Sequence, residues 1–272
     1  MRYKALCSDI DGTLLNSERD LSDRLKKVIK RLPIDFPIIL ASSRMPKAMR
    51  HLLEDLDRVN NPLISYNGGF VQNAKGETLE STTIPLGLVD KIYQFVSKTN
   101  LHISLFYEDN WYEAKEDYWS KREIQNTKTE PIWMQTEDVL SLWSKKNNGA
   151  HKIMTMGDSQ EISWLFGELH LLFSKELHLY RSKDTYIEIA PKSISKATAL
   201  RKILNECYDF PIEEVIAFGD NYNDIDLLQA VGMGIAVANA RPELKMIAND
   251  HTLHHKEDGV ALSIEKYFEL MN

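Results

Sequence analysis

Short apolar runs that end in polar residues recur along the chain and predict the buried strands of a parallel sheet. The first run covers residues 3–8 and leads directly into Asp9, Asp11 and Gly12. Its length and the turn signal that follows favour a strand over a helix. Similar runs, each followed by polar or turn residues, occur at 36–41, 63–66, 214–218 and 232–237.

Helical patterns separate these runs. Residues 21–32 have apolar side chains at 21, 25, 28, 29 and 32, close to the period of a helix, and Ser22 is a suitable N-cap. Further helices are predicted near 48–56, 196–207, 224–231, 242–247 and 259–271. Strands that alternate with helices across short links are typical of a parallel sheet with crossover helices. The pattern therefore predicts an α/β fold.

The character of the chain changes over residues 85–185. All five tryptophans lie in this span, strands such as 103–107 alternate with helices such as 86–99 and 159–173, and no strand ends in paired carboxylates. We interpret the span as an inserted α/β domain with its own core, to which most of its aromatic side chains belong. Residues 1–84 and 186–272 then form a discontinuous first domain, to which the strand predicted at 186–191 returns.

Asp9 and Asp11 lie at the carboxyl end of the first strand, the edge at which open α/β sheets bind ligands. Two like charges about 4 Å apart cost about 4 kcal/mol at an effective dielectric constant near 20, so the pair predicts a cation with oxygen ligands, Mg²⁺ by preference. An EF-hand loop would need glycine sixth and glutamate twelfth, where this chain has Gly12 fourth and Asp20 twelfth. An ordinary aspartate-rich turn stays open as the alternative.

Polar side chains also mark other element ends. Ser42 and Ser43 follow the second strand, and Asp220 and Asp224 follow the strand at 214–218. Lys196 stands in the first turn of a helix, where the dipole disfavours a cation unless an anion binds there. Helix capping by the serines and a surface lysine are the plain alternatives. Gathered at one sheet edge, these groups suit phosphoryl transfer.

Composition narrows the possibilities. The chain has 272 residues, 43 % of them hydrophobic, and a formal net charge of −7 with both signs mixed along the chain, so nucleic acid is not an expected partner. With only Cys7 and Cys207, a reducing compartment is expected, and Cys7 is interpreted as a core residue. No signal peptide or run of about 18 apolar residues is present, which predicts a soluble cytoplasmic protein without a membrane partner.

Two further features are given plain interpretations. The pair Gly232 and Gly234 lacks a third glycine and lies inside a predicted strand, so it does not indicate dinucleotide binding. The histidines at 251, 254 and 255 lack the spacing of a metal site and are interpreted as part of a solvated loop.

Taken in order, these motifs resemble those of the haloacid dehalogenase superfamily, and within it the Cof-like phosphatases. The matching segments are 8–15 (SDIDGTLL), 41–44 (ASSR), 66–69 (YNGG), 188–191 (EIAP) with Ser195 and Lys196, 219–224 (GDNYND) and 257–261 (EDGVA). The resemblance implies a Rossmann-like three-layer core with a mainly parallel sheet, and a large α/β cap inserted between the second and third motifs, at 85–185. It also implies Mg²⁺ as cofactor and a phosphoric monoester hydrolase that works through an aspartyl-phosphate.

The resemblance also implies roles for individual residues. Asp9 is the expected nucleophile, and Asp11 is the expected general acid and base. The metal would be held by the Asp9 side chain, the Asp11 carbonyl and Asp220, with Asp224 in support. The expected substrate and phosphate contacts come from Asp9, Gly12, Thr13, Ser42, Ser43, Lys196 and Asn223, while Arg44 and Asn67 are candidates for contacting the leaving group.

The chain departs from the family pattern at three positions. Ser43, Ser193 and Ala197 stand where the family usually has glycines, which bears on the geometry of the phosphate loop rather than on the reaction class. Cap residues are expected to set specificity, with sugar phosphates as the first candidate substrates and phosphorylated cofactors as the second. A phosphomutase and a non-catalytic protein that binds metal or phosphometabolites are alternative functions, and the sequence does not define the oligomeric state.

Overall fold

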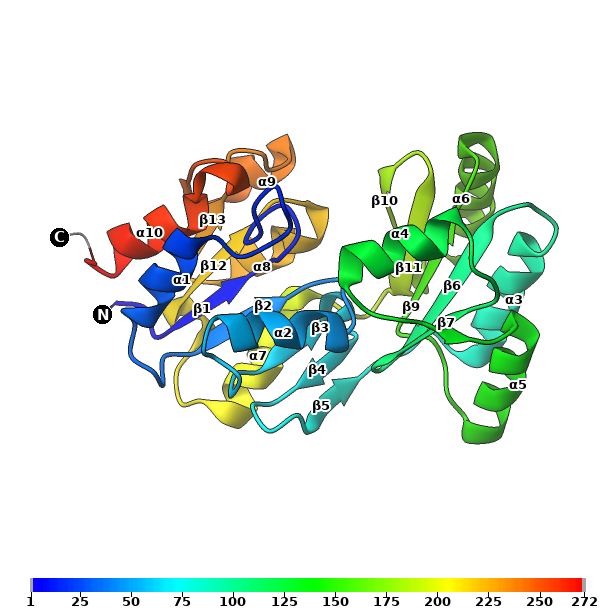
Figure 1. Ribbon diagram of the computed structural model, residues 1–272, viewed down its shortest axis with the longest axis horizontal. Helices are drawn as coiled ribbons and strands as arrows, with labels where there is room; N and C mark the ends of the chain where they lie inside the picture. Colours follow the sequence, from blue (N-terminus) through cyan, green and yellow to red (C-terminus); the bar gives the residue numbers. More distant parts are fainter. Residues whose placement is uncertain (1, 271–272) are drawn as a thin grey trace. The chain divides into compact units, whose positions relative to one another are not determined.

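A computed structural model describes residues 2–270 and divides the chain into two compact units. The first unit contains the described residues up to Glu80 together with those from Ser195 onward, and the second is Ser81–Ile194 (Figure 1). Within the described residues, no helix is both long enough and apolar enough to cross a membrane.

The first unit is built on an eight-stranded sheet with the order β14-β13-β12-β1-β2-β3-β4-β5. The first six strands of this order pair in parallel, and β4 joins β3 in the antiparallel sense. The bounds are β1 Ala5–Ser8, β2 Ile38–Ala41, β3 Leu63–Ser65, β4 Phe70–Gln72, β5 Thr78–Ser81, β12 Val215–Gly219, β13 Met233–Ala236 and β14 Asp250–His251. The mainly parallel sheet predicted from the sequence is confirmed.

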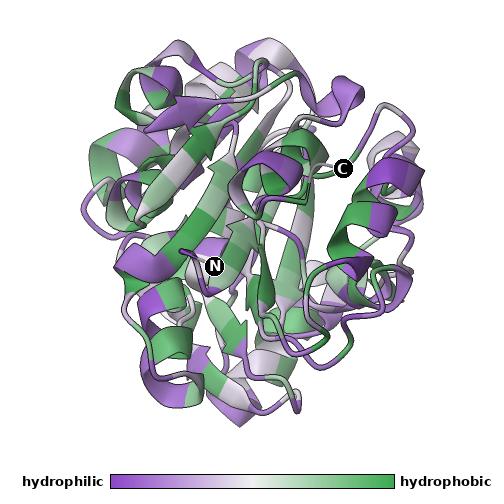
Figure 2. Cartoon of the chain, turned by 90° about the vertical axis from the view of Figure 1, so that its left-hand side faces the viewer, coloured by the Kyte–Doolittle hydropathy of each residue, from purple (hydrophilic) through white to green (hydrophobic). Residues whose placement is uncertain are grey.

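Helices cover both faces of this sheet. Their bounds are α1 Asp23–Lys30, α2 Lys47–Asp55, α7 Lys196–Cys207, α8 Ile225–Ala230, α9 Pro242–Ile247 and α10 Gly259–Tyr267. Helix α1 contacts α10, and α7 contacts α8. The chain adds strands from β1 toward β3 on one side of β1 and from β12 toward β14 on the other side. Because crossovers between parallel strands are right-handed, these two directions place helices on opposite faces of the sheet. The strands are largely hydrophobic and the helices carry hydrophilic residues, as Figure 2 shows.

Local sequence explains where two of these helices begin. The hydroxyl of Ser22 accepts a hydrogen bond from the Leu25 amide at 3.1 Å, and Ser195 caps α7 in the same way through the Thr198 amide, also at 3.1 Å. The predicted cap of α1 is therefore confirmed. Cys7 is fully buried in β1, and burial raises the pKa of its thiol to about 12, which agrees with a core residue rather than a nucleophile.

The second unit has a six-stranded, mostly antiparallel sheet with the order β10-β11-β9-β6-β7-β8. Its strands are β6 His102–Tyr107, β7 Asn110–Glu113, β8 Ile132–Trp133, β9 Lys152–Met156, β10 Leu177–Lys183 and β11 Tyr186–Pro191. Its helices are α3 Leu86–Val96, α4 Tyr118–Thr127, α5 Thr136–Lys146 and α6 Ser159–Phe173. Side chains from β6, β9 and β11 form its hydrophobic core with side chains from α3, α5 and α6.

The predicted return to the first domain at residue 186 is wrong. Strand β11 pairs with β9 and with β10, so it belongs to the sheet of the second unit, which extends to Ile194 instead of 185. Residues 184 and 185, expected to link two domains, instead form the turn of the antiparallel hairpin of β10 and β11. At the other junction the second unit begins at Ser81, four residues before the expected position.

The tryptophans of the second unit divide between core and surface. Trp111 and Trp143 are each only 1 % exposed, whereas Trp133 is 48 % exposed on the edge strand β8. Trp164 is 43 % exposed on α6, whose Ile162 and Leu165 face the core. The expectation that these side chains are mainly core residues therefore holds for some of them only.

Candidate active site

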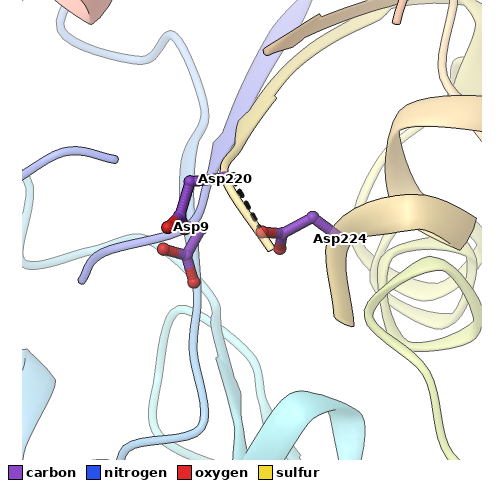
Figure 3. Close-up of side chains that lie close together, drawn as sticks. All are labelled: Asp9, Asp220 and Asp224. Carbon is purple, nitrogen blue, oxygen red and sulfur yellow. Dashed lines mark hydrogen bonds between the residues drawn. The ribbon is translucent and has the colours of Figure 1, made fainter. Parts of the chain in front are cut away.

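Three aspartates meet at the carboxyl ends of the neighbouring strands β1 and β12 (Figure 3). Asp9 follows β1, Asp220 follows β12, and Asp224 ends the short 3₁₀ helix Tyr222–Asp224. One oxygen of each carboxylate lies within 4.8 Å of the others. Asp224 is held by the amides of Asp220 and Asn221, which donate to its Oδ2 at 3.0 and 3.1 Å.

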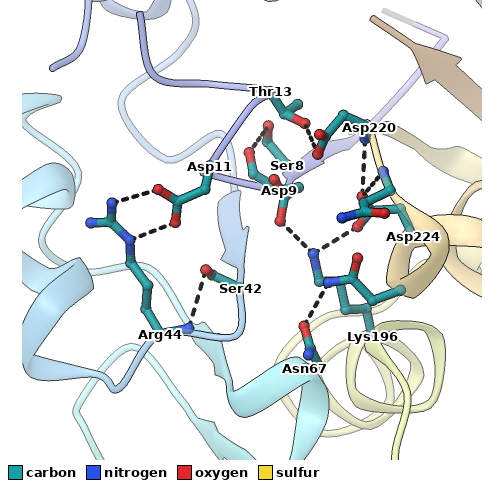
Figure 4. A network of polar contacts seen from close by, with 12 residues as sticks. Ser8, Asp9, Asp11, Thr13, Ser42, Arg44, Asn67, Lys196, Asp220 and Asp224 are labelled. Carbon is teal, nitrogen blue, oxygen red and sulfur yellow. Dashed lines mark hydrogen bonds and ion pairs between the residues drawn. The ribbon is translucent and has the colours of Figure 1, made fainter. Parts of the chain in front are cut away.

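Lys196 inserts its ammonium group between two of these carboxylates. Its Nζ lies 2.5 Å from Oδ1 of Asp9 and 2.6 Å from Oδ1 of Asp224, and the side chain is fully buried (Figure 4). Burial by itself lowers the pKa of Lys196, but Asp224 and Asp9 outweigh that effect and raise it. Lys196 is therefore an ammonium ion at neutral pH, and not the exposed surface lysine that was the plain alternative.

The buried carboxylates carry more negative charge than Lys196 balances. Three carboxylates and one ammonium leave a formal charge of −2 (−3 + 1). Burial, opposed by Lys196, raises the pKa of Asp9 well above its usual value, and burial together with Asp224 raises the pKa of Asp220 to about 7. Burial is the main cause of both shifts, and the neighbouring carboxylates add to it.

The cluster fits a hard divalent cation. Its donors are all carboxylate oxygens, and Oδ2 of Asp9 is buried without a hydrogen-bond partner. Such a buried acceptor is costly unless a ligand satisfies it. Of the four aspartates expected at a metal, the structure gathers the carboxylates of Asp9, Asp220 and Asp224, whereas that of Asp11 lies against Arg44.

Arg44 and Asp11 form a two-pronged ion pair beside the cluster (Figure 4). Nε of Arg44 lies 2.7 Å from Oδ2 of Asp11, and Nη2 lies 2.8 Å from Oδ1. The arginine side chain is buried, and that of Asp11 is 41 % exposed. This pairing was not predicted from the sequence, in which Arg44 was a candidate only for contacting a leaving group.

Ser42 and Thr13 point hydroxyl groups into the same network. Ser42 is buried after β2, and its Oγ accepts from the Arg44 amide at 3.2 Å, which orients the polypeptide after the strand. Thr13 donates to Oδ1 of Asp220 at 3.2 Å, so the loop after β1 contacts the loop after β12 directly. Ser43 is half-buried between Ser42 and Arg44.

Asn67, Asn223 and Gly12 lie beside the aspartate cluster on the loops that follow three strands. Nδ2 of Asn223 donates to Oδ1 of Asn67 at 2.8 Å, which links the loops after β12 and β3. Gly12 has a φ of +84°, and a Cβ there would lie 2.6 Å from Oδ2 of Asp220. Only glycine satisfies both the backbone conformation and this close approach.

Asn239 and His255 were not predicted as site residues from the sequence. Nδ2 of Asn239 donates to the carbonyl of Gly12 at 2.7 Å, and Nδ1 of His255 lies 2.7 Å from the carbonyl of Leu15. Asn239 could have been found, because it follows β13, the next parallel strand along the same edge. For His255 the sequence offers no comparable signal.

Comparison with known proteins identifies the family. Residues 6–264 match the model of the haloacid dehalogenase-like hydrolases, so the chain belongs to this family. A Haemophilus influenzae protein named as a phosphatase is 34 % identical over 98 % of this chain and 99 % of its own length. The 5-amino-6-(5-phospho-D-ribitylamino)uracil phosphatase YitU of Bacillus subtilis is 25 % identical over 96 % of each chain.

Solved structures agree with this assignment. A haloacid dehalogenase-like hydrolase from Bacteroides thetaiotaomicron has a TM-score of 0.86 and 27 % identity, covering 97 % of this chain and 99 % of its own. The superfamily, the Cof-like subfamily and the enzyme class predicted from the sequence, a hydrolase of the phosphatase kind, are confirmed.

Proposed function

We propose that this chain is a Mg²⁺-dependent phosphatase of small phosphorylated metabolites and acts through an aspartyl-phosphate on Asp9. The observation that carries the proposal is the environment of Asp9. One of its oxygens is held by Lys196, while the other is buried at the ligand-binding edge of the sheet without a hydrogen-bond partner. A carboxylate with one anchored and one uncommitted oxygen is suited to attack phosphorus.

Asp11 serves as general acid and base. It is two residues from Asp9, its carboxylate is partly exposed, and Arg44 fixes the plane of that carboxylate. From this position Asp11 delivers a proton to the leaving oxygen as the phosphorus–oxygen bond breaks. It then accepts a proton from the water that hydrolyses the aspartyl-phosphate, which releases phosphate and restores Asp9.

Asp9, Asp220 and the carbonyl of Asp11 would hold Mg²⁺, with Asp224 in support. When bound, the metal supplies positive charge that neutralises the phosphoryl oxygens. Asp224 also accepts two backbone hydrogen bonds and contacts Lys196. It therefore orients Lys196 and the loop after β12 in addition to contributing negative charge for the metal.

Lys196 and Ser42 bind the phosphoryl oxygens, and the loop at Gly12 and Thr13 lines the phosphate site. Ser43 and Asn223 line the same space. Ser195 caps α7, and Lys196 follows it as the first residue of the helix. Gly68 lies so close to this helix start that a Cβ there would clash with the Ser195 carbonyl. The first unit, residues 2–80 and 195–270, thus supplies the catalytic groups. The second unit is the cap that selects the substrate.

Sugar phosphates are the first candidate substrates, and phosphorylated cofactors and their precursors are the second. The name of the Bacillus subtilis relative describes a phosphate on a ribitylamino chain of a uracil, which supports both classes. Arg44 and Asn67, both on the first unit, are the candidates for contacting the leaving group. A cytoplasmic location follows from these substrates.

The test is phosphate release from a panel of sugar phosphates and phosphorylated cofactors, measured with Mg²⁺ and with a chelator. We expect release that requires the metal, with a clear ranking among the substrates. A mutase would instead return the phosphoryl group to its product and release little phosphate. Absence of release from every compound by a folded, Mg²⁺-binding chain would contradict the proposal.

A further inference from the structure

The loop that carries Asp11 is a tight turn whose outer carbonyls need partners from elsewhere in the chain. The amides of Thr13, Leu14 and Leu15 all point at the carbonyl of Ile10, at 3.4, 3.0 and 3.1 Å. This convergence leaves the carbonyls of Gly12 and Leu15 directed away from the turn. Both accept hydrogen bonds from side chains more than 200 residues later, Asn239 and His255.

Asn239 uses both ends of its amide. Its Nδ2 donates to the Gly12 carbonyl at 2.7 Å, and its Oδ1 accepts from the backbone amide of His255 at 3.1 Å. A carbonyl can only accept and an amide N–H can only donate, so the two partners fix which end of the side chain faces the loop. Asn239 therefore ties the loop after β1 to the segment after β14 in one orientation.

His255 holds the other end of the turn. Its Nδ1 lies 2.7 Å from the Leu15 carbonyl, which requires the proton to be on Nδ1. The neighbouring ring of His254 stacks on it, with the ring centroids 4.6 Å apart. The histidine cluster that the sequence left as a solvated loop thus contributes a side chain to the turn that follows the first strand.

We infer that Asn239 is a positioning residue of the active site, acting with His255 to hold the loop of Asp11, Gly12 and Thr13 against Asp220. This inference rests on the proposed function. The Gly12 carbonyl belongs to the peptide that precedes Thr13, and Thr13 bonds Asp220 while Gly12 packs on the same carboxylate. Fixing that one peptide therefore sets the proposed acid and base relative to a proposed metal ligand.

The experiment compares Asn239→Ala with a matched control, Asn249→Ala. Asn249 also uses its side chain for a 2.7 Å hydrogen bond to the backbone, but its partner is the Gly234 amide in β13 and not the loop after β1. Each variant is measured for turnover of p-nitrophenyl phosphate with Mg²⁺, for its unfolding midpoint, and for hydrogen exchange of the peptide that contains residues 10–15.

We expect Asn239→Ala to lower kcat about 10- to 100-fold with a change in KM of about twofold or less, because small displacements of catalytic groups cost this much. Exchange in residues 10–15 should become faster. Asn249→Ala should keep native kcat and native exchange in that peptide. The inference is overturned if Asn239→Ala retains native kcat and exchange, or if both variants lose kcat equally.

A second pair of variants covers the case in which Asn239→Ala does not fold. His255→Asn keeps an N–H donor near the position of Nδ1, whereas His255→Ala removes it. We expect His255→Asn to retain more kcat and slower exchange in residues 10–15 than His255→Ala, and equal values would overturn the inference. If the native chain releases no phosphate at all, the proposed function fails, and the exchange data still decide whether Asn239 and His255 hold the loop.

Discussion

Arg44 donates hydrogen bonds to both carboxylate oxygens of Asp11, from Nε at 2.7 Å and from Nη2 at 2.8 Å. The third nitrogen of the guanidinium, Nη1, donates to the Ala48 carbonyl in α2 at 3.3 Å. A planar fork of this kind fixes the rotation of a carboxylate as well as its place. The orientation of the proposed acid and base is therefore set from the start of a helix that follows the second strand.

Replacing Arg44 with lysine should lower kcat about 10-fold or more, because lysine keeps the charge but cannot hold both oxygens. The half-saturating Mg²⁺ concentration should change little, since the Asp11 carboxylate lies outside the aspartate cluster. Steady-state kinetics over a Mg²⁺ series measures both quantities. Arg24→Lys is the control, because Arg24 pairs with Glu265 through an exposed contact at 2.6 Å. Native kcat in Arg44→Lys would contradict the prediction.

Replacing Lys196 with methionine should destabilise the chain by about 3–5 kcal/mol in the presence of a chelator, since it leaves two buried carboxylates without their counter-ion. The loss should be smaller with saturating Mg²⁺, which would be bound by the same carboxylates. Urea unfolding under both conditions provides the measurement.

The control for Lys196 lies in the same helix. Lys202 pairs with Glu206 at 2.7 Å on the exposed side of α7, so Lys202→Met should leave the free energy of unfolding nearly unchanged. Equal losses for the two lysine variants would show that the effect belongs to the helix rather than to the buried charge.

Alanine substitutions at two glycines distinguish the effect of backbone strain from the effect of crowding at the site. Gly12 and Gly76 have φ values of +84° and +78°, so alanine at either should cost about 1–2 kcal/mol of stability. A Cβ at residue 76 meets nothing within 4 Å, whereas at residue 12 it meets Asp220. Gly12→Ala should therefore also raise the half-saturating Mg²⁺ concentration and lower kcat. Gly76→Ala should retain both native values, and matching activity in the two variants would refute the crowding argument.

His102 of the second unit should make stability fall as the pH rises from 6 to 9. Its ring bridges two carboxylates, with Nε2 2.7 Å from Glu113 and Nδ1 2.8 Å from Asp117, and Lys115 lies 3.9 Å from Asp117. Burial alone lowers the pKa of His102, but Glu113 and then Asp117 outweigh it and raise the pKa above 6.5. A histidine whose pKa is higher in the folded state than in the unfolded state stabilises the fold when it is protonated. This contribution is fully present at pH values below the pKa of the unfolded state, and it is lost as the pH rises through the pKa of the folded state.

The measurement is the free energy of unfolding of the native chain and of His102→Gln at several pH values. The difference between them should shrink from pH 6 to pH 9. His151 gives the opposite sign, because burial lowers its pKa to about 3. Its ring therefore stays neutral in the folded chain while the unfolded chain takes up a proton below about pH 6.5. The free energy of unfolding consequently falls as the pH drops below that value. A difference for His102→Gln that is flat across this range would contradict the assignment.

The meeting of Asp9, Asp220 and Asp224 could be anticipated from the sequence, because carboxylates at the ends of parallel strands share one sheet edge. Arg44 could be placed near that edge by the same rule. Its pairing with Asp11 could not, since the choice of partner depends on the path of the chain between residues 11 and 44.

Other features depend on contacts that leave no local mark. The run at 186–191 is equally apolar whichever sheet it joins, and the pairing with β9, some 30 residues earlier in the chain, leaves no local signal in it. Asn239 and His255 bind backbone carbonyls, which every residue possesses, so no residue type in the first loop indicates them. Sequence patterns thus located charged groups at strand ends but not the neutral side chains that hold a loop.

The most direct test of the central claim compares phosphate release by the native chain and by Asp9→Asn, with Mg²⁺ and the best substrate from the panel. Asparagine retains the size and the Oδ1 contact to Lys196 but is a poor nucleophile toward phosphorus. The account predicts that a folded Asp9→Asn variant releases no phosphate above background and forms no covalent phospho-enzyme. Sustained metal-dependent release by that variant would show that Asp9 is not the nucleophile.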